Sequence, residues 1–195
     1  MEGATTATVL LMGRPGSGKG TQAKLLADAF GWKSVSSGAR FKEIRDGEGP
    51  LGKRVRQAYD AGKLLPDWFP TYLLQESVLN VGSEQGVVCE GFARTRTQAE
   101  AFDDIMTWLE RPYVALNLEV PEEEALRRQV ERAKTEHRPD SDAEEKVRAR
   151  FAEYRRNTEP ALAYFREKGL CVDIDGTPDI DTIHRDILSR LSRGV

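Results

Sequence analysis

The stretch GRPGSGKGTQ, residues 13–22, constrains the fold more than any other part of the chain. It follows an apolar run at residues 6–12 that predicts a β-strand, and it precedes a stretch with helical periodicity. One apolar stripe of that helix is formed by Ala23, Leu26, Ala27 and Phe30. A glycine-rich turn between a strand and a helix aims backbone N–H groups and the positive end of the helix dipole at one centre. This context predicts an oligophosphate-binding loop; the alternative is a glycine-rich turn with a solvated lysine.

The loop departs from the general pattern at one position, because Gly20 stands where serine or threonine usually follows the lysine. Lys19 is expected to reach the β- and γ-phosphates, and Thr21 is the nearest hydroxyl that can support a magnesium shell. The residues predicted to form this phosphate-binding loop are Gly13, Pro15, Gly16, Ser17, Gly18, Lys19, Gly20 and Thr21.

Five short runs rich in β-branched and aliphatic residues alternate with helical stretches. The runs are residues 6–12, 32–35, 86–90, 113–120 and 170–175. This order predicts a five-stranded parallel sheet covered on both faces by helices. About fifty residues separate the second and third runs, far more than a crossover needs, so we expect a helical insertion there. One stripe of that insertion is formed by Leu51, Val55 and Tyr59.

The chain is expected to form a single domain with two excursions from its core. The core is assigned to residues 1–35, 81–126 and 151–195, the insertion to 36–80, and a short lid with its flanking helices to 127–150. The irregular part of the lid is residues 133–142, which separate two helical segments.

Composition excludes several classes of function. The 195 residues carry 29 Lys and Arg against 32 Asp and Glu, so the surplus of positive charge that nucleic-acid binding usually needs is absent. No apolar run reaches the length of a membrane span, and the N-terminal segment lacks a basic signal region, so we expect a cytoplasmic protein. Cys89 and Cys171 lie in apolar runs and are expected to be buried strand residues, neither disulfide-bonded nor metal-binding.

Five segments, in order, resemble the adenylate kinases and related nucleoside monophosphate kinases. They are GKGTQ at 18–22, SSG at 36–38, GKLLP at 62–66, EGFARTRTQAE at 90–100, and the arginine-bearing helices followed by NTEP at 157–160. The resemblance covers essentially the whole chain and matches the short-lid form. It implies a P-loop NTPase-type three-layer α/β/α fold with a monophosphate-binding insertion and a lid.

The resemblance also implies roles for individual residues. The AMP-binding residues would be Ser37, Lys42, Lys63, Leu64, Leu65, Gly91, Arg94, Gln98, Arg138 and Arg150. Beyond the loop, the ATP-binding residues would be Arg128, which in similar proteins stacks on the adenine, Arg132 and Gly176. The catalytic residues would be Lys19, Arg94, Arg132, Arg138 and Arg150. Arginines such as Arg127 and Arg148 are instead expected to be solvated surface residues.

The implied reaction is reversible, magnesium-dependent transfer of the γ-phosphoryl group of ATP to AMP, giving two ADP. The Gln98 side-chain amide can donate and accept together, which matches the edge of adenine and favours AMP. Two alternatives stay open: a UMP/CMP kinase, and a catalytically weak nucleotide-binding or sensor relative. The expected partners are ATP and AMP or ADP, with no nucleic acid, no membrane and a monomeric state.

Four positions depart from the family pattern. Ala39 replaces an aspartate, and Lys42 replaces a phosphate-binding arginine, which predicts weaker capture of AMP. Glu90 replaces an aspartate but can still orient magnesium-bound water, so the magnesium shell is expected to involve Thr21 and Glu90. Ala93 replaces a proline, which predicts looser placement of Arg94.

Three smaller expectations concern nearby side chains. Arg40 is a hypothetical substitute for the missing phosphate-binding arginine. No structural zinc is expected, because the lid offers only His137 and acidic side chains, and His137 is expected to be a solvent-exposed lid residue. His184 is expected to lie on the C-terminal helix.

Overall fold

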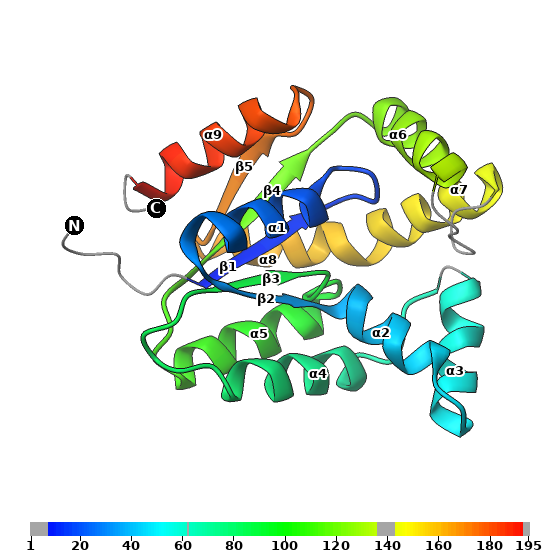
Figure 1. The fold of residues 1–195 in the computed structure, drawn as a ribbon, viewed down its shortest axis with the longest axis horizontal. Helices are drawn as coiled ribbons and strands as arrows, with labels where there is room; N and C mark the ends of the chain where they lie inside the picture. The colour runs from blue at the N-terminus through cyan, green and yellow to red at the C-terminus, as the bar shows by residue number, and fades with distance from the viewer. Residues whose placement is uncertain (1–7, 62, 136–142, 193–195) are drawn as a thin grey trace.

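The computed structural model describes residues 8–61, 63–135 and 143–192 (Figure 1). At its centre is a parallel sheet with the strand order β2-β3-β1-β4-β5. The strands are β1 (Thr8–Gly13), β2 (Lys33–Ser36), β3 (Val87–Glu90), β4 (Tyr113–Glu119) and β5 (Cys171–Asp175). The five predicted strands and their parallel arrangement are therefore confirmed. Within the described ranges, no helix is both long enough and apolar enough to cross a membrane.

Helices cover both faces of the sheet. They are α1 (Lys19–Phe30), α2 (Ser37–Asp46), α3 (Pro50–Asp60), α4 (Trp68–Leu79), α5 (Arg96–Trp108), α6 (Glu122–Thr135), α7 (Glu144–Glu153), α8 (Glu159–Glu167) and α9 (Ile180–Ser192). A π-helical turn, η1 (Tyr154–Thr158), joins α7 to α8. Helices α1 and α9 pack on one face, and α4, α5 and α8 pack on the other (Figure 1). The predicted three-layer α/β/α fold is confirmed.

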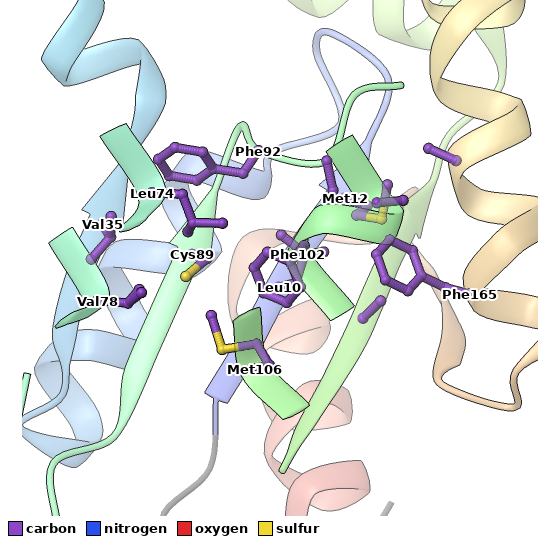
Figure 2. Close-up of a cluster of buried hydrophobic side chains, with 14 of the residues drawn as sticks. Leu10, Met12, Val35, Leu74, Val78, Cys89, Phe92, Phe102, Met106 and Phe165 are labelled. Carbon is purple, nitrogen blue, oxygen red and sulfur yellow. The ribbon is translucent and has the colours of Figure 1, made fainter. Parts of the chain in front are cut away.

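The alternation of side chains along β1 shows why both faces are buried. Leu10 and Met12 point into the core beneath α4, α5 and α8, whereas Val9 and Leu11 point toward α1 and α9. Figure 2 shows the first of these cores, in which Phe102, Met106 and Phe165 meet the strands. Because these residues are almost fully buried, they hold the strands rigidly and fix where each strand ends.

The connections from β1 and β3 leave these neighbouring strands in opposite directions and on opposite faces. Helix α1 leads from β1 toward β2, and α5 leads from β3 toward β4. Ligands of open parallel sheets bind at such a switch point, at the carboxyl ends of the strands. The loop after β1 and the turn after β3 both lie at this edge.

The insertion between β2 and β3 contains α2, α3 and α4. Helix α4 joins the main core through Leu73, Leu74 and Val78, whereas α2 and α3 extend away from the sheet and pack on each other (Figure 1). At the other side of the sheet edge, α6 and α7 share a small cluster with Val120. Of the irregular lid segment predicted at 133–142, residues 133–135 belong to α6. Residues 136–142, with His137 and Arg138, lie outside the described residues.

Two predictions about burial, those for Phe30 and Cys171, are wrong. Phe30, expected on the buried stripe of α1, is 45% exposed and stacks on Trp32, because it ends the helix beyond the sheet. On the predicted stripe of α3, Val55 is buried and Leu51 is 49% exposed. Cys89 is fully buried as expected, but Cys171 is only partly buried, in the edge strand β5. Both are free cysteines.

Candidate active site

A cleft of about 890 Å³ opens at the carboxyl edge of the sheet. Typical small-molecule pockets measure roughly 300–1,000 Å³, so the cleft is large for a single ligand. Its walls come from the loop after β1, the insertion, the β3–α5 turn, and helices α6, α7 and α9. The predicted site residues that line it are Pro15, Gly16, Ser17, Gly18, Lys19, Gly20, Thr21, Lys42, Lys63, Leu64, Leu65, Glu90, Gly91, Arg94, Gln98, Arg128, Arg132 and Arg150.

Three predicted residues lie at the margin of this cleft. Gly13 lines a smaller adjoining pocket of about 60 Å³ together with Lys19 and Arg94. Ser37 and Gly176 line neither pocket. The Ser37 hydroxyl is buried and donates to the Gly91 carbonyl at 2.7 Å, so it joins the start of α2 to the end of β3.

The phosphate loop has the conformation that its glycines allow. Gly13 and Gly16 have φ of +135° and +90°, and a Cβ on either would lie within 2.7 Å of a backbone oxygen. Gly20 is different, because a Cβ there would meet no protein atom within 4 Å. The glycine after the lysine is therefore not required by packing within the described part of the protein, and its open side faces the cleft.

Lys19 begins α1 at the centre of a group of charged side chains. Burial lowers the pKa of Lys19 from 10.5 to about 8. Burial is the largest cause of this net shift; the Glu90 carboxylate opposes it, and the positive charges of Arg94, Arg150 and Arg132 add to it. Residues from α1, the β3–α5 turn, α6 and α7 thus bring positive charge to one region before any ligand is bound. Such a preorganised field suits a polyanion, whose charge would favour the ammonium form of Lys19.

Arg94 is held firmly in the turn between β3 and α5. Its Nε donates to the Gly91 carbonyl at 2.8 Å, and its backbone N–H donates to Gln98 Oε1 at 3.0 Å. Its carbonyl accepts from the Thr158 hydroxyl at 3.1 Å. Ala93 has φ of +53°, a value that the ring of proline forbids, so this turn differs from one built with the family proline. The placement of Arg94 rests on these hydrogen bonds.

The other departures from the family pattern have clear positions. Lys42 lines the cleft, where it can contribute positive charge, and Ala39 lies beside it. Arg40 does not line the cleft; it pairs with Glu43 at 2.7 Å and Glu76 at 3.0 Å. In this conformation two carboxylates hold the Arg40 guanidinium, so the hypothesis that Arg40 replaces the missing phosphate-binding arginine requires both ion pairs to break and stays a prediction.

Arg128 stands at the opposite end of the cleft from the insertion. Its guanidinium donates to the carbonyls of Gly176 at 2.8 Å and Thr177 at 3.1 Å, and to Glu124 at 2.7 Å. These bonds fix the plane of the guanidinium beside the turn after β5, so a flat base could stack on it. Gly176 does not line the cleft itself, but its carbonyl helps to position the Arg128 guanidinium.

The residues proposed for the magnesium shell offer suitable chemistry. The Thr21 hydroxyl and the Glu90 carboxylate both line the cleft, and oxygen ligands of this kind suit Mg²⁺. Glu90 is oriented by Ser36, whose hydroxyl donates to it at 2.9 Å. The buried Ser17 hydroxyl in the same loop has no hydrogen-bond partner among the described residues, as expected of a group that a phosphate or ion completes. The residues present therefore fit a magnesium–nucleotide complex.

The described residues contain no group of three or more His, Cys, Asp or Glu side chains able to hold a metal ion. The expected absence of zinc stays a prediction, since residues 136–142 of the lid lie outside the described residues. His184 lies on α9, as predicted, with Nδ1 3.2 Å from Gln22 Oε1.

Two contributors to the site were missed from the sequence. Asp67 accepts hydrogen bonds from Gln98 and Thr95, although it lies 31 and 28 positions away from them. Thr158 reaches Arg94 from the π-helical turn η1, across 64 positions. No local sequence pattern predicts contacts between residues so far apart in the chain. The only signal, which concerned Thr158, was that NTEP at 157–160 matches a family segment.

A family model for adenylate kinase matches residues 11–170. An adenylate kinase of Thermus thermophilus is 38% identical over 94% of this chain and 96% of its own. Adenylate kinases of Archaeoglobus fulgidus and Micrococcus luteus are 32% and 35% identical over 95% and 96% of this chain, and 98% and 89% of theirs. The chain belongs to the adenylate kinase family.

This membership makes the chain a nucleoside monophosphate kinase, a transferase, and it confirms the resemblance on which the sequence analysis relied. Adenylate kinases bind ATP and AMP or ADP and generally use Mg²⁺ with ATP. The arginines that converge around Lys19 and the oxygen ligands of the cleft agree with that chemistry.

Proposed function

We propose that this protein catalyses reversible phosphoryl transfer from Mg-ATP to AMP, giving two ADP. The observation that carries the proposal is that Lys19, Arg94, Arg132 and Arg150 all line one cleft. The three arginines lie near enough to Lys19 to lower its pKa. Transfer between two phosphate chains brings many negative charges together, and cationic groups from several elements can neutralise them.

The two ends of the cleft suit different nucleotides. The loop at Gly13 to Thr21 and the Arg128 guanidinium would hold ATP, with its phosphates at the N-terminus of α1. Lys42, Lys63, Leu64, Leu65, Gly91, Arg94 and Gln98 form the wall that would hold AMP. Ser37 supports this wall through Gly91. Arg132 and Arg150 would act between the two, with Arg138 as a further candidate outside the described residues.

The reaction needs no covalent enzyme intermediate. An oxygen of the AMP phosphate attacks the γ-phosphorus of ATP, and the bond from that phosphorus to the β–γ bridging oxygen breaks, so that ADP leaves on both sides. The attacking oxygen is already anionic near neutral pH, which removes the need for a general base. Bound magnesium, held through Thr21 and Glu90, would neutralise charge on the ATP phosphates. Lys19 and the arginines align the two phosphate chains and exclude water that would otherwise accept the phosphoryl group.

The test is ADP formation from Mg-ATP with AMP, UMP, CMP or no acceptor, with an EDTA control. We expect rapid, metal-dependent turnover with AMP. Preference for UMP or CMP would assign the pyrimidine-directed alternative. ATP binding without turnover of any acceptor would assign a nucleotide-binding or sensor relative. A cytoplasmic location and a monomeric state are part of this proposal and are tested by fractionation and by light scattering.

A matched pair of variants tests the role of the converging arginines. Arg148 and Arg150 lie two positions apart on α7, but Arg148 is 60% exposed and pairs with Glu144, whereas Arg150 lines the cleft. Arg150→Met should lower kcat by about 100-fold or more, the scale seen when one group that stabilises transition-state charge is removed. Arg148→Met should leave kcat unchanged. Equal effects of the two substitutions would contradict the proposed site.

A further inference from the structure

Asp67 lies at the start of α4, where its carboxylate meets the β3–α5 turn. Its Oδ1 accepts hydrogen bonds from Gln98 Nε2 at 2.8 Å and from the Thr95 hydroxyl at 2.8 Å. The Asp67 side chain makes no capping bond to its own helix, and its two hydrogen-bond donors, Thr95 and Gln98, belong to the turn and to α5. The helix α4 is thereby connected to the residue that faces the acceptor end of the cleft.

The two ends of the Gln98 amide have opposite partners. Nε2 donates to the Asp67 carboxylate, and Oε1 accepts from the backbone N–H of Arg94 at 3.0 Å. If the amide turned over, Nε2 would face the Arg94 N–H and Oε1 would face the carboxylate, so both hydrogen bonds would be replaced by repulsive contacts. The side chain is only 4% exposed, and no water can easily compensate for that loss.

Thr95 is the third member of the hydrogen-bond network formed with Asp67 and Gln98. Its hydroxyl donates its single hydrogen to Asp67 and accepts the backbone N–H of Gln98 at 3.2 Å as the N-cap of α5. The Asp67 carboxylate therefore holds both the side chain and, through Thr95, the backbone of Gln98.

We propose that Asp67 is a positioning residue that fixes the direction of the Gln98 amide, so that the acceptor site selects a 6-aminopurine over a 6-oxopurine. The proposal rests on the proposed function, in which Gln98 faces the base of the acceptor nucleotide. After its bonds to the protein, the amide keeps one hydrogen on Nε2 and one lone pair on Oε1 for a ligand. Gln98 lines the cleft, where a base could use them.

The chemistry of the two purines explains why the direction matters. Adenine presents a donor at its exocyclic amine and an acceptor at N1, whereas hypoxanthine presents an acceptor at O6 and a donor at N1. An amide that turns freely could satisfy either base. An amide held in one direction satisfies only one of them and leaves the other with unpaired or repelling buried groups, which discriminates strongly.

The experiment compares kcat/KM for AMP and for inosine monophosphate at saturating Mg-ATP. The wild-type protein should prefer AMP, and Asp67→Ala should lower the AMP-to-inosine-monophosphate ratio by about tenfold or more, as expected when a directed hydrogen-bond pair is lost. Asp67→Asn keeps an acceptor oxygen for Gln98 and Thr95 and should restore most of the ratio. If Asp67→Ala does not fold, Asp67→Ser is measured in its place with the same expectation.

Thr71→Val is the matched control for a merely structural effect. The Thr71 hydroxyl donates to the Asp67 backbone carbonyl at 2.8 Å, so its removal disturbs the same turn of α4 without touching the Gln98 amide. This variant should lose some stability and keep the wild-type ratio. The proposal is overturned if Asp67→Ala lowers kcat/KM equally for both nucleotides, or if Thr71→Val changes the ratio as much as Asp67→Ala does. Failure of the wild-type protein to use AMP at all would instead overturn the proposed function.

Discussion

The surroundings of Lys19 determine its pKa and therefore its charge. Its position in the motif predicts a phosphate contact, but its burial among Arg94, Arg132 and Arg150 gives it a pKa of about 8. The ligand-free site therefore holds a lysine that is partly neutral in mildly alkaline solution. A polyphosphate would restore its full charge, so nucleotide binding and protonation are coupled.

We expect Mg-ATP binding at about pH 8 to be accompanied by proton uptake, and the affinity to fall as the pH rises further, because neutral Lys19 must be protonated first. Calorimetry in two buffers with different ionisation enthalpies measures the uptake. Lys19→Met should bind ATP more weakly and show no such uptake. An equal uptake by Lys19→Met would assign the proton to another group.

The lowered pKa of Lys19 also predicts how the stability of the fold depends on pH. The pKa of Lys19 is lower in the folded protein than its usual 10.5, so between about pH 8 and 10.5 the unfolded chain binds more protons. The contribution of Lys19 to the free energy of unfolding is unfavourable below pH 8 and is relieved as the pH rises. Lys19→Met should therefore have the higher Tm at neutral pH, with the difference shrinking toward pH 10. A constant difference in Tm would contradict the shift.

At the scale of elements, the β3–α5 turn is held by three segments that are distant in sequence. Ser37 at the start of α2 binds the Gly91 carbonyl, Asp67 at the start of α4 binds Gln98, and Thr158 in η1 binds the Arg94 carbonyl. A π-helical turn is uncommon and often lies at a functional site. Here it brings the Thr158 hydroxyl to the backbone of Arg94.

Thr158→Val keeps the shape of this buried side chain but removes its hydrogen bond to Arg94. We expect the free energy of unfolding to fall by about 1 kcal/mol. The KM for AMP should rise a few fold with little change in the KM for ATP, because Arg94 faces the acceptor end.

Ser77→Ala is the control for Thr158→Val. The Ser77 hydroxyl bonds to the Leu73 carbonyl within α4, and Ser77 does not line the cleft. Ser77→Ala should lower the free energy of unfolding by a similar amount without changing the KM for AMP or for ATP. An unchanged KM for AMP in Thr158→Val would show that the hydrogen bond serves folding alone.

At the scale of the whole molecule, one cleft has room for two nucleotides because the sheet edge is flanked by the insertion on one side and by α6 and α7 on the other (Figure 1). A bisubstrate analogue with two adenosines joined by a pentaphosphate chain should bind one molecule per chain. Its phosphates would cross the region of Lys19 and its arginines.

We expect this analogue to raise Tm more than ATP or AMP alone at equal concentration, because the second nucleotide binds as part of the same molecule. Thermal shift and calorimetry provide the change in Tm and the stoichiometry. The analogue should raise the Tm of the Arg150→Met variant much less than that of the wild-type protein, and it should raise the Tm of Arg148→Met as much as that of the wild type. Binding of two analogue molecules per chain would mean that the two nucleotide sites are independent.

Much of the fold could be predicted because it depends on local patterns. The apolar runs gave five parallel strands, and the glycine-rich segment gave the loop. The family resemblance separated the surface arginines of α6 and α7 from those that line the cleft. Arg127 and Arg148, expected to be solvated, are 70% and 60% exposed. Periodicity reveals which face of an element is apolar, but not where the neighbouring element ends, which is why Phe30 was wrongly expected on the buried stripe of α1.

By itself, the sequence determined the strand–loop–helix unit that binds phosphate, the parallel sheet and the family, because each depends on residues close together in the chain. Only the tertiary structure decided the direction of the Gln98 amide, the support of Arg94 by Thr158, the pairing of Arg40 with two carboxylates and the lowered pKa of Lys19. Each of these depends on atoms that approach within a few ångströms across long separations in sequence, and on the burial that such packing creates.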